Sequence, residues 1–288
     1  MSEANVKVTV LVENSVGVPL GLIGEWGLAM LVDWAGHKFL FDTGEQGHLL
    51  GNAARLGVDL QSVHALVMSH GHYDHTGGMR AFLRHRGQLP VYAHPDFFAP
   101  HYTSSPQEQY IGVPFCQEEL TGSGARFIFS REPVEIAPGL WLSGEIPRRT
   151  SYETGDSRLY RVVEGNKVAD PVLDDLSLFG VTSEGLVIIL GCAHAGLVNI
   201  IEHARQVTRV ERVYGLVGGT HLGPVSDHQR DATLEYLKQL DLQFIAVNHC
   251  TGLPVMAQLA GIFGPRFRFA PAGTKLELPA PIAPAPAE

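Results

Sequence analysis

The chain has 288 residues, of which 45% are hydrophobic and 18% charged, a composition typical of a globular protein with a large core rather than of a disordered one. Its formal charge is −9 and it has no block of Lys or Arg, so we expect no nucleic-acid partner. Three widely spaced cysteines argue against a disulfide framework. The sequence also lacks a signal-peptide pattern and any apolar run of roughly eighteen residues, so we expect a cytoplasmic protein without a membrane span.

The first part of the chain predicts strands followed by helices. Residues 7–14 alternate apolar and polar side chains as a half-buried strand does. In chain order there follow two strands joined by a turn at Ala35-Gly36, a short helix, a buried strand, a helix and another strand. These predicted elements cover residues 29–34, 38–44, 52–60, 62–70, 76–87 and 90–96.

The middle and the second half of the chain differ in their periodicity. Between residues 95 and 155 periodicity fades, apart from two possible short strands, and we expect a long loop region near the active site. From residue 174 two strands are followed by alternating helices and strands up to residue 263. The sequence therefore predicts one α/β domain over residues 1–275, with helices covering β-sheets, and a disordered Pro/Ala-rich tail over residues 276–288.

Four potential metal ligands lie at the end of the buried strand predicted over residues 62–70 and in the loop after it. They are His70, His72, Asp74 and His75, and the glycines among them permit a crowded loop. Imidazole and carboxylate suit zinc, iron or manganese, and four such groups within six residues exceed one part of a closed structural site. The motif therefore indicates two adjacent divalent ions. The alternative is a polar capping loop in which Asp74 caps a helix and the histidines are merely exposed.

The spacing HxHxDH at residues 70–75, preceded by FDTG at 41–44, resembles the metallo-β-lactamase superfamily. The resemblance implies a four-layer αββα sandwich with the metals at one edge. It assigns the first two histidines of the motif to one metal, and the aspartate and third histidine to the other. Segments 191–199, 218–222 and 248–252 are similar to the branch of dihydropterin ribofuranosyl-aminobenzene phosphate synthase-related proteins.

Three later histidines each follow a predicted strand. His194 stands between a strand and a helix, where it would ligate a metal or cap the helix. The resemblance maps His249 onto the last metal ligand of the family. His221 is not needed as a ligand if the other candidate side chains already hold the metals. We therefore expect it to contact substrate or transfer a proton, with a structural role as the alternative. The other eight histidines show no convergence and are expected to be exposed or structural. They are His37, His48, His64, His85, His94, His101, His203 and His228.

The sequence departs from the family at one position. Most two-metal members have a bridging aspartate where this chain has Cys192. Three replacements for this aspartate are open: Cys192 would reach a metal, Asp174 or Asp175 would take its place, or water alone would bridge the two metals. Alternatively, Cys192 is no more than a small buried residue. The resemblance further implies that Asp42 supports a ligand histidine through a hydrogen bond.

These residues predict a dinuclear metal-dependent hydrolase that uses a metal-activated hydroxide on an ester-like bond, a phosphoester (as in a phosphodiesterase) or a lactone. Asp74 and His221 are the candidate catalytic residues, and Arg148 and Arg149 are candidates for holding an anionic small-molecule substrate. We expect two zinc ions, with iron or manganese as alternatives. The rival hypotheses are a synthase-like transferase, a redox di-iron protein and a non-enzymatic metal-binding protein.

Overall fold

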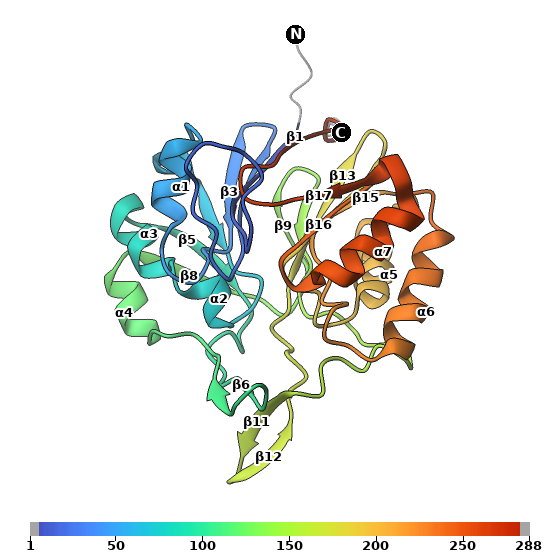
Figure 1. Cartoon of the computed structure of the whole chain (residues 1–288). Coiled ribbons are helices and arrows are strands. Elements are labelled where there is room, and N and C mark those ends of the chain that lie inside the picture. The colour runs from blue at the N-terminus through green and yellow to red at the C-terminus, as the bar shows by residue number, and fades with distance from the viewer. Residues whose placement is uncertain (1–5, 283–288) are drawn as a thin grey trace, which may run out of the picture.

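The computed structural model describes residues 6–282, which form two β-sheets packed face to face with helices on both outer surfaces (Figure 1). This is the four-layer αββα sandwich that the sequence predicts. No helix among residues 6–282 combines the length and the apolar character needed to cross a membrane.

The first sheet has seven strands and is built from the N-terminal half of the chain plus one C-terminal strand. Its outer face is covered by α1 (Leu49–Arg55), α3 (Met79–Arg86) and α4 (Gln117–Gly122) (Figure 1). Strands β3, β4, β5 and β8 run parallel to one another, so their carboxyl ends share one edge. In spatial order the strands are β18 (Lys275–Leu278), β1 (Val6–Val12), β2 (Ala29–Trp34), β3 (His37–Phe41), β4 (Ala65–Val67), β5 (Leu89–Ala93) and β8 (Ala125–Phe129).

The second sheet also has seven strands, which lie between residues 134 and 269. Helices α5 (Leu197–Thr208), α6 (Asp227–Lys238) and α7 (Leu253–Phe263) cover it on the opposite side of the molecule (Figure 1). Strands β14 to β17 are parallel, which again brings carboxyl ends to one edge. In spatial order the strands are β17 (Phe267–Phe269), β16 (Phe244–Asn248), β15 (Val213–Gly219), β14 (Gly185–Leu190), β13 (Ser177–Thr182), β10 (Leu140–Leu142) and β9 (Val134–Ala137).

Apolar side chains form one core between the sheets and one beneath each helical layer. Val8, Phe41 and Ile189 belong to the central core, which contains residues of both sheets. Phe82 of α3 packs in the core of the first sheet, and Ile200 of α5 packs in that of the second. Three cores stacked in this way hold the edge of the sandwich rigid where the loops of both sheets meet.

The predicted long loop region 95–155 contains more regular structure than its sequence suggests. It includes α4, β8, β9 and β10, together with the short strands β6 (Tyr102–Thr103) and β7 (Gln109–Tyr110). With β11 (Leu159–Val163) and β12 (Asn166–Ala169), the last two form a small third sheet that extends from the sandwich at the bottom of Figure 1. Its strands are too short for a periodicity to be recognised, and the sheet is completed by the pairing of β6 with the distant strand β11.

The predicted disordered tail starts too early. Residues Lys275–Leu278 form β18, which pairs with β1 at the edge of the first sheet. Leu276 and Leu278 are buried while Lys275 and Glu277 are exposed, a period-2 pattern that the neighbouring prolines and alanines obscure. The prediction for residues 283–288 lies outside the described residues.

Candidate metal centre

The potential ligands lie in four loops, each of which leaves the carboxyl end of a strand at the shared edge. His70 and His72 follow β4, and Asp74 and His75 lie in the single-turn helix α2 (Tyr73–Thr76). Cys192 and His194 follow β14, His221 follows β15, and His249 and Cys250 follow β16. Because three of these strands are adjacent and parallel, their loops gather where ligands bind in open α/β sheets.

Three imidazoles form the first ligand group, consisting of His70, His72 and His194. One ring nitrogen of each lies within 4.8 Å of the others. The Nε2 atom of His70 is 2.9 Å from Nδ1 of His72, and the rings of His70 and His194 have centroids 4.8 Å apart. The Nε2 atom of His194 is buried and has no hydrogen-bond partner among the described residues. Converging neutral nitrogens with an unsatisfied member suit a divalent cation of the zinc type.

A carboxylate and two imidazoles form the second group, consisting of Asp74, His75 and His249. The Nε2 atoms of the two histidines are 3.1 Å apart. The Oδ2 atom of Asp74 lies 3.3 Å from Nε2 of His249 and 3.9 Å from Nε2 of His75. For the four residues of the HxHxDH motif this division is the one that the family resemblance implies, and the structure adds His194 to the first group and His249 to the second.

Hydrogen bonds behind the ligands decide which ring nitrogen is free. The carboxylate of Asp42 accepts from Nδ1 of His75 at 2.7 Å and from the hydroxyl of Ser69 at 2.7 Å. Since that hydroxyl proton is committed to Asp42, Ser69 Oγ accepts from Nδ1 of His70 at 2.9 Å. The amide oxygen of Asn14 likewise accepts from Nδ1 of His249 at 3.0 Å. In all three rings the proton is held on Nδ1, which directs the lone pair of Nε2 toward the centre.

The electrostatics of the first group also suit a cation. Burial lowers the pKa of His70 and of His194 well below the ordinary value, and neighbouring imidazoles lower them further. Burial, together with His101, lowers the pKa of His72 to about 3. These rings are therefore neutral near pH 7, as metal ligation requires.

The second group contains the charges. Burial alone would lower the pKa of His75, but Asp42 and Asp74 outweigh it and raise the pKa to about 9. Burial alone would raise the pKa of the Asp74 carboxyl, but His75 and His249 outweigh burial and hold this pKa below its usual range. A cation that binds here has to displace a proton from His75, so binding weakens as the pH falls.

Cys192 lies between the two groups, at the position of the family's bridging aspartate. Its Sγ atom is 3.2 Å from Nε2 of His75, and it forms a close group with His70 and His75. It also forms a group with His221 and Cys250, a cysteine that the sequence analysis did not single out. This position would allow Cys192 to reach a metal, although burial raises the pKa of its thiol.

The two aspartates considered as substitutes for the bridge face the backbone. Asp174 accepts a hydrogen bond from the amide of Gly71 at 2.6 Å, and Asp175 accepts one from the amide of Ala195 at 2.9 Å. Neither belongs to a ligand group among the described residues. Each instead fixes a loop that carries ligands, and burial raises the pKa of Asp175 to about 7.

The backbone of the site is strained at several positions. Asp42, Ala193, His221 and His249 have φ angles of 62°, 60°, 51° and 49°, a left-handed conformation that side chains other than glycine rarely adopt. Gly71 meets a different restriction, because a Cβ atom there would lie 2.2 Å from the carbonyl oxygen of Phe97. Such strain concentrates at functional sites, where the surrounding structure holds it in place.

His101, which was predicted to be exposed or structural, is buried directly behind the candidate ligand His72. The two rings are nearly perpendicular with centroids 5.1 Å apart. Its Nδ1 atom is 2.5 Å from Asp170, and its Nε2 atom is 3.5 Å from Asp174. Burial lowers the pKa of His101, but the two aspartates raise it by more, to about 9. No local pattern marks His101, because its partners are about 70 residues away along the chain.

Replacing His101 with Gln should therefore destabilise the protein in a pH-dependent manner. The pKa of His101 is raised in the folded state from 6.5 to about 9, so its stabilising effect is complete below pH 6.5 and is lost as the pH rises through 9. Urea unfolding of His101→Gln at pH 6 should show a loss of about 2 kcal/mol relative to the natural chain, and a smaller loss at pH 9.5. An equal loss at both pH values would show that the ion pair is not the cause.

A cavity of about 300 Å³ opens over the two ligand groups and also contains the predicted residue His221. The Nε2 atom of His221 is 3.4 Å from Oδ2 of Asp156, and Asp156 is in turn paired with Arg158 at 2.5 Å. Burial lowers the pKa of His221, but the bond to Asp156 contributes to raising it to about 9. Asp156 and Arg158 both line the cavity, and neither was predicted, because they lie between the loop region 95–155 and residue 174, where the sequence predicts no element.

The two arginines predicted to bind substrate do not line this cavity. Arg148 donates to the carbonyl oxygens of His194 and Pro171 and lines a neighbouring cavity. Arg149 lines a different cavity beside Asn199, which accepts a hydrogen bond from its backbone amide. Among the described residues, Arg158 is the only Lys or Arg that lines the cavity over the ligand groups.

Comparisons with known proteins agree with this geometry. A protein of Methanocaldococcus jannaschii named 7,8-dihydropterin-6-methyl-4-(beta-D-ribofuranosyl)-aminobenzene-5'-phosphate synthase is 29% identical over 259 residues, which cover 86% of this chain and 88% of that protein. The crystal structure of Tm1679, described as a metal-dependent hydrolase of the beta-lactamase superfamily, is 28% identical and has a TM-score of 0.81, covering 95% of this chain and 99% of that one.

More distant structures share the fold. A diphosphatase from the PhnP family has a TM-score of 0.54 and 14% identity, covering 96% of this chain and 100% of that one. The family model described as the metallo-beta-lactamase superfamily matches residues 27–205, which include the HxHxDH motif and His194. Because this match spans more than half of the chain, the protein belongs to the metallo-β-lactamase superfamily.

Proposed function

We propose that the protein is a metal-dependent hydrolase that cleaves an ester-like bond of a small molecule with the help of two divalent cations. The observation that carries the proposal is the pair of adjacent three-residue ligand groups beneath one cavity. His70, His72 and His194 would hold one cation, and Asp74, His75 and His249 would hold the other. We propose zinc for both because the donors are mostly neutral imidazoles, with iron or manganese as alternatives.

When bound, two such cations lower the pKa of a coordinated water toward neutrality and stabilise negative charge that develops on the substrate. The chain itself supplies the remaining functions. Asp74 contributes the only carboxylate to the two ligand groups, and Asp42 orients His75. His221, with its pKa raised to about 9, holds a proton near pH 7 and would deliver it to the leaving group.

The lining of the cavity favours an anionic or strongly polar substrate. Arg158 lines it beside the hydroxyl-bearing residues Thr103 and Ser105, and a guanidinium suits phosphate or carboxylate oxygens. Phosphoesters, including phosphodiesters, and lactones are the classes that we propose. The absence of a basic patch in the sequence supports a small-molecule substrate over nucleic acid, and we propose a cytoplasmic location.

The second candidate is a transfer reaction of the kind named for the Methanocaldococcus jannaschii synthase. It is favoured by the 29% identity that extends over 86% of this chain. The same ligand groups would serve either reaction, because a cation pair can activate water or stabilise a departing phosphate equally well.

The decisive experiment is an assay of the zinc-loaded protein against phosphodiesters, lactones and phosphoribosyl donors with an aromatic amine. Hydrolysis of either of the first two classes, lost on chelation and restored by zinc, supports the proposal. Turnover of the phosphoribosyl donor alone would replace it with the transfer reaction. No turnover of any class by protein with full metal content would reject both.

The role proposed for His221 predicts a change in the pH profile when Asp156 is replaced by Asn. A proton donor works only below its pKa, so activity should fall above about pH 9 in the natural protein. Without the carboxylate the pKa of His221 drops, and the fall should begin about two pH units lower, with about a tenfold loss of kcat at pH 8. An unchanged alkaline limb would exclude His221 as the donor.

A further inference from the structure

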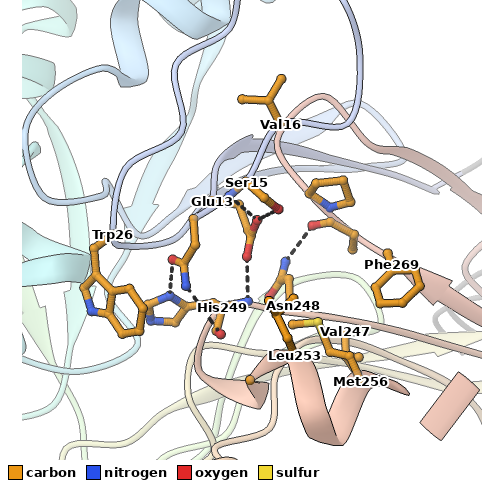
Figure 2. A pocket seen from close by; sticks show the side chains of 14 residues that line it. Glu13, Ser15, Val16, Trp26, Val247, Asn248, His249, Leu253, Met256 and Phe269 are labelled. Carbon is orange, nitrogen blue, oxygen red and sulfur yellow. Dashed lines mark hydrogen bonds between the residues drawn. The ribbon is translucent and has the colours of Figure 1, made fainter. Parts of the chain in front are cut away.

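A second cavity, of about 410 Å³, lies on the other side of the ligand His249 (Figure 2). It is formed by the loop after β1, the start of α7 and the segment after β17. Its volume falls within the range of roughly 300–1,000 Å³ that is usual for small-molecule sites. The function proposed above does not use this cavity.

The lining of this second cavity is mostly apolar and contains no Lys or Arg among the described residues. Trp26, Leu253 and Phe269 line it, although these large side chains are 54%, 75% and 54% exposed. Exposed apolar side chains that gather around one cavity mark a binding site more often than a solvated surface. Its lining, all within the described residues, includes no Lys or Arg, and its single acid, Glu13, is occupied. The two carboxylate oxygens of Glu13 accept from the amide of His249 and from Ser15.

One polar atom in the lining is left without a partner. Asn248 is 1% exposed, and its side-chain nitrogen donates to the carbonyl of Ala270. That bond fixes the orientation of the amide, and the remaining oxygen has no hydrogen-bond partner among the described residues. A buried acceptor of this kind is costly unless a donor reaches it, and a ligand with an N–H or O–H group would supply one.

The second cavity shares two walls with the cavity over the metal ligands. Trp26 and His249 line both. The ring of Trp26 lies against that of His249 with centroids 5.5 Å apart, while the Nε2 atom of His249 faces Asp74 on the far side (Figure 2 shows Trp26 and His249). The ring of His249 thus forms part of the wall between the second cavity and the ligand groups.

We propose that the second cavity binds an uncharged flat ring bearing a hydrogen-bond donor, and that this ring is part of the substrate whose reacting bond lies over the ligand groups. The claim about the substrate rests on the function proposed above, whereas the claim about ring binding does not. The two cavities then bind chemically different parts of one substrate molecule. The polar bond is placed among histidines and Arg158, and the ring is placed among Trp26, Leu253 and Phe269.

The binding part can be tested without any knowledge of the substrate, using indole as the probe. Indole is flat and uncharged, has one N–H donor and is a poor metal ligand. Titrated into the full-length protein as purified, it should shift the indole N–H resonance of Trp26 saturably, identified by its loss in Trp26→Phe. In metal-free protein, indole-3-acetate should bind at least about tenfold more weakly, because the described lining of the second cavity has no Lys or Arg to pair with its carboxylate. No saturable shift, or a preference for the acetate, would overturn the proposal.

Matched substitutions locate the site. Val16→Trp should fill the cavity from its rim and Leu253→Asp should place a charge in it, and each should weaken indole binding at least about tenfold. The controls are Leu20→Trp in the same loop and Ala257→Asp in the same helix, both exposed positions outside the lining. Equal affinities in the test and control variants would contradict the assignment of the cavity.

A kinetic comparison tests the link to the substrate. If the proposed hydrolysis is found, a 2-naphthyl ester should be cleaved with a kcat/KM about tenfold above that of the phenyl ester of the same acid, and Val16→Trp should remove the preference. Hydrolysis without such a preference would overturn the substrate claim alone. Indole binding without hydrolysis of any ester would leave the ring site intact and reject the proposed function.

Discussion

Replacing Asp74 with Ala is expected to reduce the metal content to about one ion per chain and to lower kcat/KM for the proposed hydrolysis by about 10³-fold or more. Asp74 supplies the only carboxylate of the two ligand groups, and it lies within 3.3 Å of His249. The fold should survive, because the contact of this residue with the first sheet is made by its backbone carbonyl, which accepts from Leu28. Elemental analysis together with kinetics measures both effects.

The neighbouring Tyr73 offers the matched control. It belongs to the same short helix and lines the same cavity, but it is in neither ligand group among the described residues. Tyr73→Phe should therefore keep the full metal content. Asp74→Ala protein with undiminished metal and turnover would show that this carboxylate is not a ligand.

The largest expected effect on stability comes from Asp42. Its carboxylate is fully buried and accepts three hydrogen bonds, from the amide and hydroxyl of Ser69 and from His75, each at 2.7 Å. Asp42→Asn keeps a side chain that tolerates the φ of 62° at this position, so the backbone is not the cause of any change. Loss of the charge should cost about 3 kcal/mol in the free energy of unfolding, measured in urea on metal-free protein.

Asp42→Asn should also weaken metal binding by about 10–100-fold. An amide nitrogen facing Nδ1 of His75 would favour the proton on Nε2, which is the atom directed at the second ligand group. Asp33→Ala is the control, since the carboxylate of Asp33 accepts one exposed hydrogen bond among residues 6–282, from the amide of Gly36. It should cost less than about 1 kcal/mol and leave metal affinity unchanged. Equal effects of the two substitutions would remove the special role of Asp42.

The α/β class could be predicted from the sequence because its information is local, whereas the four-layer αββα arrangement was implied by the resemblance to the family. β2 and β3 show strand periodicity with a turn at Ala35-Gly36, and α5 shows helical periodicity. The members of the two ligand groups could be predicted from the sequence for a related reason. Four of their members lie within residues 70–75, and the other two each follow an apolar strand.

The parts of the site that the sequence did not reveal depend on contacts between distant segments. His101 pairs with Asp170, and Asp156 pairs with the predicted residue His221, which is 65 residues away. Asp156 and the short strand β6 lie in segments without periodicity, so nothing near them in the chain marks their position. The same reason accounts for Arg149, whose charge suggested a substrate contact although the fold places it over a different cavity.

The ligands are divided unequally between the two sheets, and this division bears on how the protein acquires metal. Four of the six come from the loop after β4, while His194 and His249 come from the second sheet. Neither half of the chain can complete either group, so strong binding has to wait until both sheets have folded and docked. Bound metal ions would then link the loops of the two sheets and stabilise their docking. Removal of the ions should increase hydrogen exchange first in the loops at this edge.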